Sequence, residues 1–172
     1  MKRILILAAG LMLMTTATFA QKFCFVDMEY ILGKMPSYTE AQKQLDVVSA
    51  GFQKDIEAKR KVVDDMYKSF QAEQVLMTDQ MKQQKIKEIE TSEKEVKELQ
   101  KKKFGPDGEL FTKRKDLVKP IQDKVYDEIQ KYASAKGYDF IFDKSSGPSM
   151  LYATERLNKS DEILSNMGIT KK

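Results

Sequence analysis

The sequence LDVVSAGFQKDIEAKRKVVDDMYKSF, residues 45–70, decides the fold of this chain. Its apolar residues recur mostly at intervals of three and four, at Leu45, Val48, Phe52, Ile56, Val63, Met66 and Phe70. This spacing places them in a narrow stripe along one side of an α-helix. Because such a stripe is too thin for a globular core, it predicts a long helix that packs along one partner helix.

The partner helix is expected immediately downstream. Residues 37–104 contain no proline, and Gly51 is the only glycine among them. Residues that favour helices are abundant in this span. One uninterrupted helix over this span would extend on the order of 100 Å. We favour instead an antiparallel hairpin with arms of roughly 50–60 Å. Its turn is expected at residues 75–79, where Thr78 is suited to cap the second helix. The stripe of that helix is thinner, with Met81, Ile86, Ile89, Val96 and Leu99.

A strand and a short helix are expected before the hairpin. Residues 23–26, with the sequence FCFV, form a short apolar run that predicts a buried strand. Asp27 follows, and its carboxylate is suited to cap a helix over residues 28–32. Gly33 and Pro36 are expected to end this helix.

The returning part of the hairpin is interrupted at residues 105–108, where the sequence Gly-Pro-Asp-Gly predicts a kink or a loop. Apolar residues at helical spacing continue over residues 110–132. Pro120 lies inside this pattern, and we expect it to start a new helix at its first turn. Gly137 is expected to end that helix.

The last third of the chain predicts a small sheet and a terminal helix. Residues 138–143 and 150–153 have strand composition with a turn between them, so we expect a hairpin of two strands. Ser160 is suited to cap a short helix over residues 161–167, which Gly168 would close. With the first strand, this gives an α+β fold, mostly α, with three short strands. So small a core needs support from association with other subunits.

Residues 1–20 have the pattern of a secretory signal peptide. Lys2 and Arg3 precede an unbroken apolar run, and small residues lead to a cleavage site near Ala20. The run is too short for a membrane-spanning helix, which needs ~20 residues. The mature protein is therefore expected to start at Gln21 or Lys22 and to act outside the cytoplasm, which excludes most nucleotide-driven roles.

These predictions divide the chain into a signal peptide, an arm and a body. Residues 1–20 are the signal peptide, and residues 37–116 form the helical-hairpin arm. The body, with its strands and packing helices, consists of residues 21–36 and 117–172. Because the first strand and the last third of the chain must meet, the base of the arm closes on itself.

The composition excludes several classes of function. The 172 residues include 30 basic and 26 acidic ones, and the formal net charge of +4 falls to +2 without Lys2 and Arg3. Mixed charges of this kind indicate a solvated surface rather than a nucleic-acid interface. The chain has no histidine, so Ser-His-Asp and Cys-His catalysis and most zinc sites are excluded. We therefore expect neither an enzyme nor a cofactor or metal.

Cys24 is the only cysteine, so it cannot form a disulfide within the chain. The favoured interpretation is a small apolar residue in the first strand. A lipid-anchored cysteine after a lipoprotein signal is an alternative, although Gln21, Lys22 and Phe23 precede it rather than the small residues that such sites need. An intermolecular disulfide is a further option.

Several short motifs follow one another along the mature chain: Phe25-Val26-Asp27-Met28, Pro36-Ser37-Tyr38, Leu117-Val118-Lys119-Pro120-Ile121, Gly137-Tyr138-Asp139-Phe140-Ile141-Phe142-Asp143-Lys144, Leu151-Tyr152-Ala153, Asp161-Glu162-Ile163-Leu164 and Met167-Gly168-Ile169. In this order and spacing they resemble the Skp/OmpH family of periplasmic chaperones. The resemblance covers essentially the whole mature chain. Where family members often carry an Asp-Ile-Thr-like sequence before the last helix, this chain has Asn158-Lys159-Ser160.

The resemblance implies a homotrimer in the periplasm. Strands from three subunits would form a small β body, and three hairpins would project from it as arms. Unfolded outer-membrane β-barrel proteins would be held between the arms without ATP, which prevents their aggregation. The body would bring together the apolar residues of the strands: Phe23, Phe25, Val26, Phe140, Ile141, Phe142, Leu151 and Tyr152.

Two groups of arm residues are candidates for contacts with other molecules. The first lies near the turn and would touch clients: Val75, Leu76, Met77 and Met81, with Phe70 and Met66. These side chains would otherwise cap or complete the seam between the helices, or simply lie exposed. The second is a basic group, consisting of Lys101, Lys102, Lys103, Lys113, Arg114 and Lys115. It could attract acidic clients or make weak contact with anionic lipid, although a solvated helix face is the simpler interpretation.

A structural role is the alternative to a chaperone. A chain with a long helical hairpin could serve as a coiled-coil adaptor in an envelope assembly. Such an adaptor would have one fixed partner, whereas a chaperone would have many unfolded ones.

Overall fold

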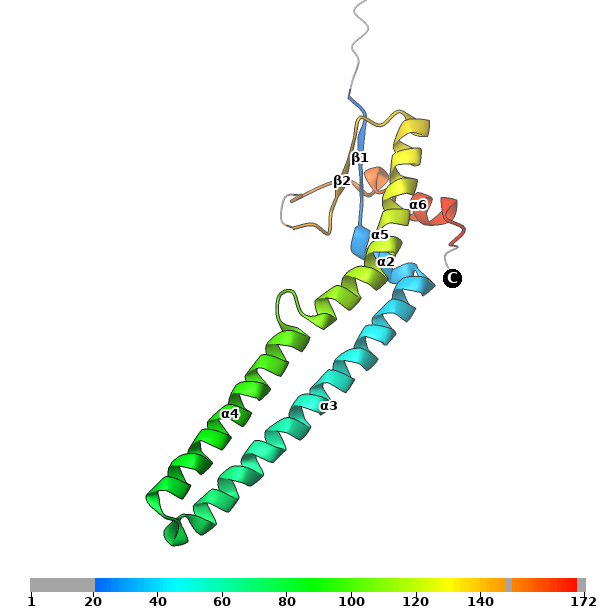
Figure 1. Cartoon of the computed structure of the whole chain (residues 1–172). Coiled ribbons are helices and arrows are strands. Elements are labelled where there is room, and N and C mark those ends of the chain that lie inside the picture. The colour runs from blue at the N-terminus through cyan, green and yellow to red at the C-terminus, as the bar shows by residue number, and fades with distance from the viewer. Residues whose placement is uncertain (1–20, 148–149, 170–172) are drawn as a thin grey trace, which may run out of the picture.

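The computed structural model describes residues 21–147 and 150–169. It shows a long helical hairpin that projects from a small body of helices and strands (Figure 1). The signal peptide expected over residues 1–20 lies outside the described residues. In chain order the elements are β1 (Phe23–Val26), α2 (Met28–Lys34), α3 (Pro36–Glu73), η1 (Gln74–Leu76), α4 (Asp79–Phe104), α5 (Glu109–Lys136), β2 (Phe140–Asp143), η2 (Glu155–Leu157) and α6 (Ser160–Asn166).

The arm is an antiparallel pair of helices, as the apolar stripe predicts. From its start at the base of the arm, the helix α3 runs first beside the first part of α5 and then beside α4 (Figure 1). The stripes of α3 and α4 meet in a seam cluster, which consists of Ile56, Val63, Ile89 and Val96 with Met66, Phe70 and Leu99 packed against them. A chain that turns back on itself hides these side chains from water, which a single uninterrupted rod would leave exposed.

The interruption at residues 105–108 is confirmed as the loop between α4 and α5. A Cβ at Gly105 would lie 2.3 Å from the carbonyl oxygen of Lys101, so only glycine fits there. Across the seam, the ring of Phe104 meets that of Phe52 edge-on, with centroids 6.1 Å apart. This contact holds α4 against α3 at the position where the returning helix breaks.

Among the residues that the structure describes, the sheet of the body consists of two strands, β1 and β2, which pair in parallel. In the register Phe23 lies opposite Phe140, and Val26 lies opposite Asp143. Parallel strands need a long crossover, and here the whole arm supplies it.

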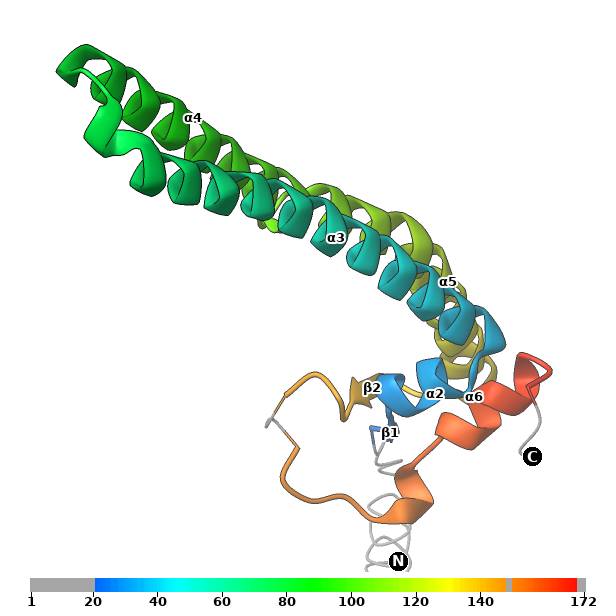
Figure 2. The ribbon, with the colours of Figure 1, turned by 90° about the horizontal axis from the view of Figure 1, so that it is seen from below.

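The prediction of a third strand and of a hairpin is wrong, because residues 150–153 form no strand and the described sheet has two strands only. On β1, the N–H of Lys159 donates to the carbonyl of Phe25, and Asn158 forms an isolated bridge with Phe25. The described residues between β2 and η2 instead extend away from α5 and α6 (Figure 2). Residues 150–153 have strand composition, but they pair with no strand among the described residues of one chain.

The core of the body lies where α2, α5 and α6 meet the sheet. Ile31, Val125 and Ile163 are fully buried at its centre. Around them pack Val26, Met28, Leu32, Met35, Ala41, Ile121, Tyr132 and Leu164. This body cluster shares no residue with the seam cluster of the arm. As predicted, Asp27 caps α2 by accepting a hydrogen bond from the N–H of Tyr30 at 2.9 Å.

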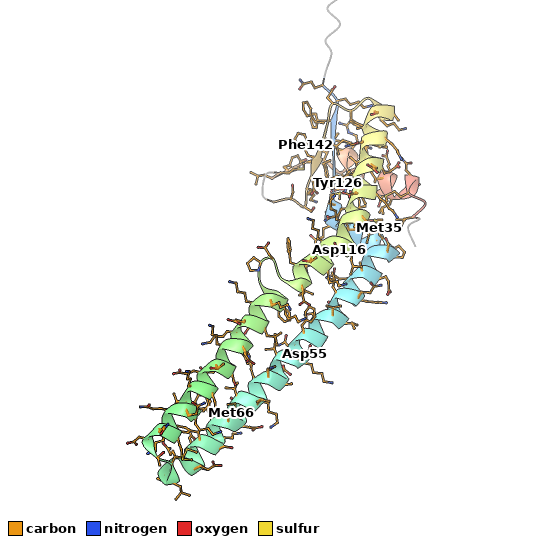
Figure 3. The ribbon with its side chains drawn as sticks, in the orientation of Figure 1. Met35, Asp55, Met66, Asp116, Tyr126 and Phe142 are labelled. Carbon is orange, nitrogen blue, oxygen red and sulfur yellow. The ribbon has the colours of Figure 1, made fainter. Side chains whose placement is uncertain are left out.

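Pro120 does not start a new helix, which corrects the sequence prediction. The helix α5 continues through it from Glu109 to Lys136. Leu117 before the proline and Ile121 after it both pack on the body cluster, so burial on either side holds the helix together. The helix changes direction between Asp116 and Tyr126, the stretch that contains this residue (Figure 3). Such a bend is the usual effect of proline inside a helix.

Ser160 is not the N-cap of α6, which is a second correction. It is the first residue of the helix, and Lys159 occupies the N-cap position, where its side chain makes no capping hydrogen bond to the helix backbone. The amide of Ser160 instead donates to the side-chain oxygen of Asn158 at 3.1 Å. The serine hydroxyl is buried and accepts a hydrogen bond from the N–H of Asp27 at 2.8 Å. The Ser160 hydroxyl oxygen, which was predicted to cap α6, therefore accepts a hydrogen bond from the distant Asp27 instead.

Candidate functional site

The end of the arm is formed as predicted at residues 75–79. The helix α3 ends at Glu73, the short η1 follows, and Thr78 caps α4 by accepting a hydrogen bond from the N–H of Met81 at 3.3 Å. This geometry leaves Val75 and Leu76 at the end of the hairpin with 84% and 89% of their surface exposed. Two neighbouring apolar side chains therefore face water at the point farthest from the body (Figure 1).

Two hollows lie beside this turn. One has a volume of about 550 Å³ and is lined by Met77, Gln80, Met81, Gln83, Gln84, Lys85 and Lys87. The other has a volume of about 450 Å³ and lies between the helices, lined by Val62, Asp65, Met66, Ser69, Phe70, Glu73, Met77, Lys85 and Ile89. Met77 and Lys85 line both hollows, so the two form one continuous region on the end of the arm.

The six predicted client residues lie together on this region, and we call them the tip surface: Met66, Phe70, Val75, Leu76, Met77 and Met81. Met66 and Phe70 are half-buried and also pack against the seam cluster. Figure 3 shows Met66 near the end of the arm, far from Met35 at its base. The apolar side chains of the tip surface thus continue from the seam outward to the exposed turn.

Two residues of this region were missed by the sequence reasoning. Val62 is exposed and lines the second hollow, although it lies beside the predicted stripe rather than in it. Lys85 lines both hollows and forms an ion pair with Glu88 at 3.1 Å. An apolar residue next to a stripe position was the available signal for Val62. Nothing in the sequence distinguished Lys85 from the other lysines.

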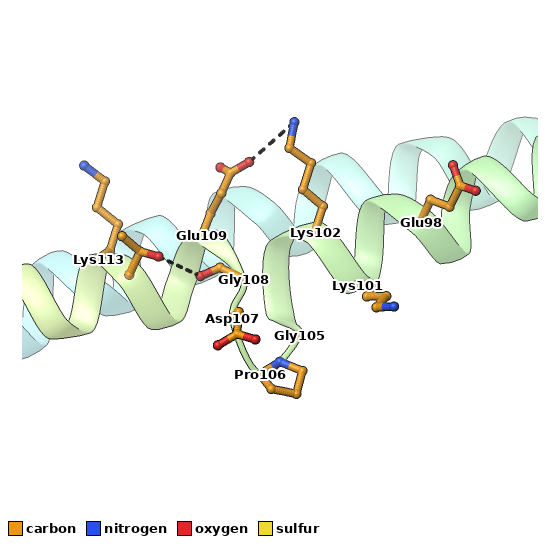
Figure 4. Close-up of a pocket in the computed structure, with 10 residues that line it drawn as sticks. Glu98, Lys101, Lys102, Gly105, Pro106, Asp107, Gly108, Glu109 and Lys113 are labelled. Carbon is orange, nitrogen blue, oxygen red and sulfur yellow. Dashed lines mark hydrogen bonds and ion pairs between the residues drawn. The ribbon is translucent and has the colours of Figure 1, made fainter.

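The predicted basic group is divided between different environments. The ammonium of Lys103 lies 2.6 Å from Glu109 and 4.3 Å from the centre of the Phe52 ring, so this lysine supports the loop between α4 and α5. Its hydrogen bond with Glu109 is the main reason that the pKa of Glu109 is lowered. Glu109 also lies 3.9 Å from Lys102 (Figure 4).

The remaining basic residues surround that loop only in part. Lys101, Lys102 and Lys113 line a hollow of about 660 Å³, together with the acidic Glu98, Asp107 and Glu109. Figure 4 shows these side chains around the loop. Arg114 and Lys115 are exposed and do not line it. The hollow therefore has mixed charge rather than a concentrated positive one.

The predicted oligomer residues divide into a buried and an exposed set. Phe25 and Val26 are buried within the single chain, and Ile141 is half-buried against the body cluster. The other five are exposed, namely Phe23, Phe140 and Phe142 on the sheet and Leu151 and Tyr152 beyond it. The rings of Phe140 and Phe142 stack with centroids 6.4 Å apart. We call these five exposed side chains the exposed apolar face of the body.

A hollow of about 350 Å³ lies beside this face, lined by Phe23, Cys24, Phe25, Phe142, Asp143, Ser146, Met150, Tyr152, Ala153 and Leu157. Cys24 is buried in β1, as the favoured interpretation predicts, and burial is the main reason that the pKa of its thiol is raised. A thiol that is both buried and protonated is a poor nucleophile. Among residues 21–147 and 150–169 no group of acidic or cysteine side chains is arranged to hold a metal ion.

The architecture places the molecule in the class of proteins in which a helical hairpin projects from a small α/β body. A family model described as "Outer membrane protein (OmpH-like)" matches residues 22–167. The chain therefore belongs to the OmpH/Skp-like outer membrane chaperone family, which is a chaperone family without known catalytic activity. The resemblance drawn from the sequence motifs is confirmed.

Two individual proteins are similar to this chain. An uncharacterized protein of Aquifex aeolicus (strain VF5) is 27% identical over 150 residues, which cover 87% of this chain and 88% of that protein. A crystal structure of an OmpH-like protein from Caulobacter crescentus CB15 superposes with a TM-score of 0.67 and covers 92% of each chain at 10% identity. The second comparison establishes the shared fold. No helix in the described part of this chain is both long enough and apolar enough to cross a membrane.

Proposed function

We propose that this protein is an ATP-independent periplasmic holdase, which binds unfolded outer-membrane β-barrel proteins and prevents their aggregation. The observation that carries this proposal is the exposed apolar end of the arm, where Val75 and Leu76 face water beside two hollows that contain methionine. Family membership supports the same conclusion. The Caulobacter crescentus protein that shares this fold is described as OmpH-like, in agreement with this family.

The chemistry of the tip surface suits weak binding of many different chains. Methionine side chains are flexible and polarizable, so they adapt to apolar groups of varied shape. Each apolar side chain that a client covers contributes up to about 1.5–3 kcal/mol. A few such contacts retain an unfolded segment and still release it without an external energy source.

The charged surface of the arm limits how strongly a client adheres. Exposed ion pairs keep the helices solvated: Lys59 of α3 pairs with Glu95 of α4, and Lys61 pairs with Asp65 on α3. The lysines near the loop between α4 and α5 add weak attraction for acidic segments or anionic lipid. Because acidic side chains line the same hollow, salt should change this attraction only modestly.

The trimer expected from the sequence belongs to this proposal. The exposed apolar face of the body has no covering layer among the described residues of one chain, and large exposed apolar patches commonly mark interfaces. Three chains joined there would cover Phe140 and Phe142 and direct three arms around a common cavity. A client in that cavity would meet tip surfaces on several sides at once.

The proposal is tested by diluting a denatured outer-membrane barrel protein into buffer with the mature chain and measuring light scattering without ATP. We expect the wild-type protein to suppress scattering at near-stoichiometric amounts. A variant with Val75→Ser, Leu76→Ser and Met81→Ser should suppress it at least tenfold less well, because 1.4 kcal/mol of lost binding energy is a factor of ten.

Val47→Ser on α3 is the matched control, since Val47 is also exposed but lies near the base of the arm. Equal activity of the triple variant and the wild type would remove the tip surface from the proposal. Equal precipitation of the barrel protein with and without the wild-type chain would contradict the holdase function. A single fixed partner in cellular crosslinking would then favour the adaptor.

A further inference from the structure

The methionines of this protein are distributed unevenly in their exposure. On the arm, Met81 is 52% exposed, and Met77 and Met66 are half-buried along open hollows. In the body, Met28 and Met35 are only 6% and 4% exposed. An oxidant dissolved in water therefore reaches the arm methionines much more readily than these two.

The apolar character of the first hollow depends on sulfur. Its lining consists of three glutamines, two lysines and the two methionines Met77 and Met81. These thioether side chains are therefore the only apolar ones in the lining. The second hollow also includes Met66 and Met77, although Val62, Phe70 and Ile89 would keep part of it apolar.

We propose that Met77 and Met81, together with Met66, form an oxidation site that controls how strongly the arm binds apolar chains. The proposal rests on the function proposed above, in which the tip surface holds clients. The oxidant is of the hypohalous acid class, such as hypochlorous acid. It is a small oxygen donor that needs no binding pocket.

The chemical step is an oxygen transfer to the thioether. The sulfur forms a bond to the oxygen of hypochlorous acid as the O–Cl bond breaks, which gives the sulfoxide, a chloride ion and a proton released to solvent. The sulfur loses the two electrons that the chlorine gains. The product side chain is polar, so water competes for surfaces that clients would otherwise cover, and enzymes that reduce methionine sulfoxide can reverse the change.

The first part of the test identifies the oxidised residues. The folded mature protein is treated with hypochlorous acid at low molar excess, and peptide mass spectrometry locates the added oxygen atoms. We expect oxygen at Met81 first and then at Met77 and Met66, with Met28 and Met35 unchanged. Oxidation of Met28 and Met35 before the arm residues would overturn the proposal.

The second part measures light scattering of a denatured barrel protein with untreated and treated chaperone. We expect treatment to weaken suppression several-fold, and the two methionine sulfoxide reductases to restore it. Suppression by a treated Met66→Leu/Met77→Leu/Met81→Leu variant is compared with that of the same variant before treatment, and it should not fall on treatment, because leucine has no sulfur to oxidise. The matched control Met150→Leu/Met167→Leu, which alters the half-buried methionines of the body, should remain sensitive.

The outcomes separate this proposal from the function on which it rests. Full suppression by a protein oxidised at all three arm methionines would overturn the oxidation site and leave the holdase function in place. Loss of suppression by the treated leucine variant would also overturn it, because the damage would then lie elsewhere. No suppression by the untreated protein would overturn both.

Discussion

Ser160 shows how one hydroxyl group joins distant parts of the body. Its oxygen accepts a hydrogen bond from the N–H of Asp27 at the start of α2 and donates one to Asn158, both at 2.8 Å. The serine is 1% exposed. Because water cannot replace a partner at this depth, the hydroxyl connects β1, α2 and α6 in one hydrogen-bonded network.

We predict that Ser160→Ala lowers the free energy of unfolding by about 1–3 kcal/mol, since the amide of Asp27 would be left buried without its acceptor. Chemical denaturation measured at matched protein concentration checks this value. Ser165→Ala, in the exposed part of the same helix, is the control and should change little. Equal loss in both variants would show that alanine in α6, and not the missing acceptor, is responsible.

Glu162 links the stability of the folded protein to pH through a small set of named partners. Its carboxylate accepts a hydrogen bond from Lys159 at 2.7 Å and another from the hydroxyl of the buried Tyr132. These two bonds, the one from Lys159 first, lower the pKa of Glu162 below its ordinary value of 4.5. The ionised form is therefore more stable in the folded protein than in the unfolded one.

Because folding lowers the pKa of Glu162, we predict that Glu162 contributes stability at pH values above 4.5. The contribution is lost as the pH falls through the lowered pKa of the folded protein. The measurement is the free energy of unfolding of the wild type and of Glu162→Gln across the acidic range. The difference between the two proteins should be largest near neutral pH and should shrink on acidification. A difference that stays constant with pH would contradict the assignment.

At the scale of the element, the arm is held by few contacts. Over residues 21–147 and 150–169, its seam cluster has four buried residues, whereas the body cluster has eleven. A helix pair with so little buried apolar surface opens locally more easily than a core does. This property suits an arm that has to accommodate clients of different sizes.

We predict that Ile89→Ala destabilises the arm by about 2–5 kcal/mol, because it removes a side chain that is 2% exposed in the seam. Ile86→Ala is the matched control one turn earlier, where the side chain is 43% exposed, and it should cost less than about 1 kcal/mol. Hydrogen exchange followed by mass spectrometry measures the protection of the arm and of the body separately.

Exchange in α3 and α4 should accelerate in the Ile89 variant, while α2 and α6 should keep the protection of the wild type. This expectation follows from the separation of the two clusters, which share no side chain. Faster exchange in the body as well would mean that the arm and the body unfold as one cooperative unit.

At the scale of the whole molecule, the exposed apolar face of the body is the main apolar surface that the described part of one chain leaves in contact with water. Leu151 and Tyr152 are 94% and 84% exposed, and the stacked Phe140 and Phe142 lie on the sheet nearby. Figure 3 shows Phe142 on the side of the sheet away from α5. A body with a two-stranded sheet gains most from covering such a face with other copies of itself.

We predict that the mature wild-type chain sediments as a trimer and that Phe140→Ser combined with Phe142→Ser dissociates it. Two phenylalanines contribute about 1.5–3 kcal/mol each when they are buried, so the dissociation constant should rise by at least tenfold. Val47→Ser should leave the mass of the assembly unchanged. Circular dichroism has to show retained helix in the double variant. A wild-type chain that sediments as a monomer would contradict the prediction.

Much of the arm could be predicted from sequence because its structure depends on local rules. The stripe from Leu45 to Phe70 required a helix with one apolar side, and Thr78 capped the returning helix where a capping residue was expected. The loop at residues 105–108 followed from proline and glycine. The tip surface was located for the same reason, since the position of a turn fixes which residues lie at the end of a hairpin.

The body was harder to predict because its contacts join residues far apart in the chain. Pro120 has the local chemistry of a helix start, but burial of Leu117 and Ile121 on one core keeps the helix continuous. Ser160 has the chemistry of a cap, but its hydroxyl serves Asp27 instead. Residues 150–153 have strand composition, but no strand in the described part of one chain pairs with them.

The sequence by itself therefore determined the family, the helical hairpin and the apolar end of the arm, since periodicity, caps and turn residues act over a few neighbouring positions. Only the tertiary structure decided the parallel pairing of β1 with β2, the path of α5 through Pro120 and the partner of Ser160. It also decided which apolar residues remain exposed on the body. These features depend on competition between distant groups for one buried surface or one hydrogen bond, and that competition is settled only when the chain is folded.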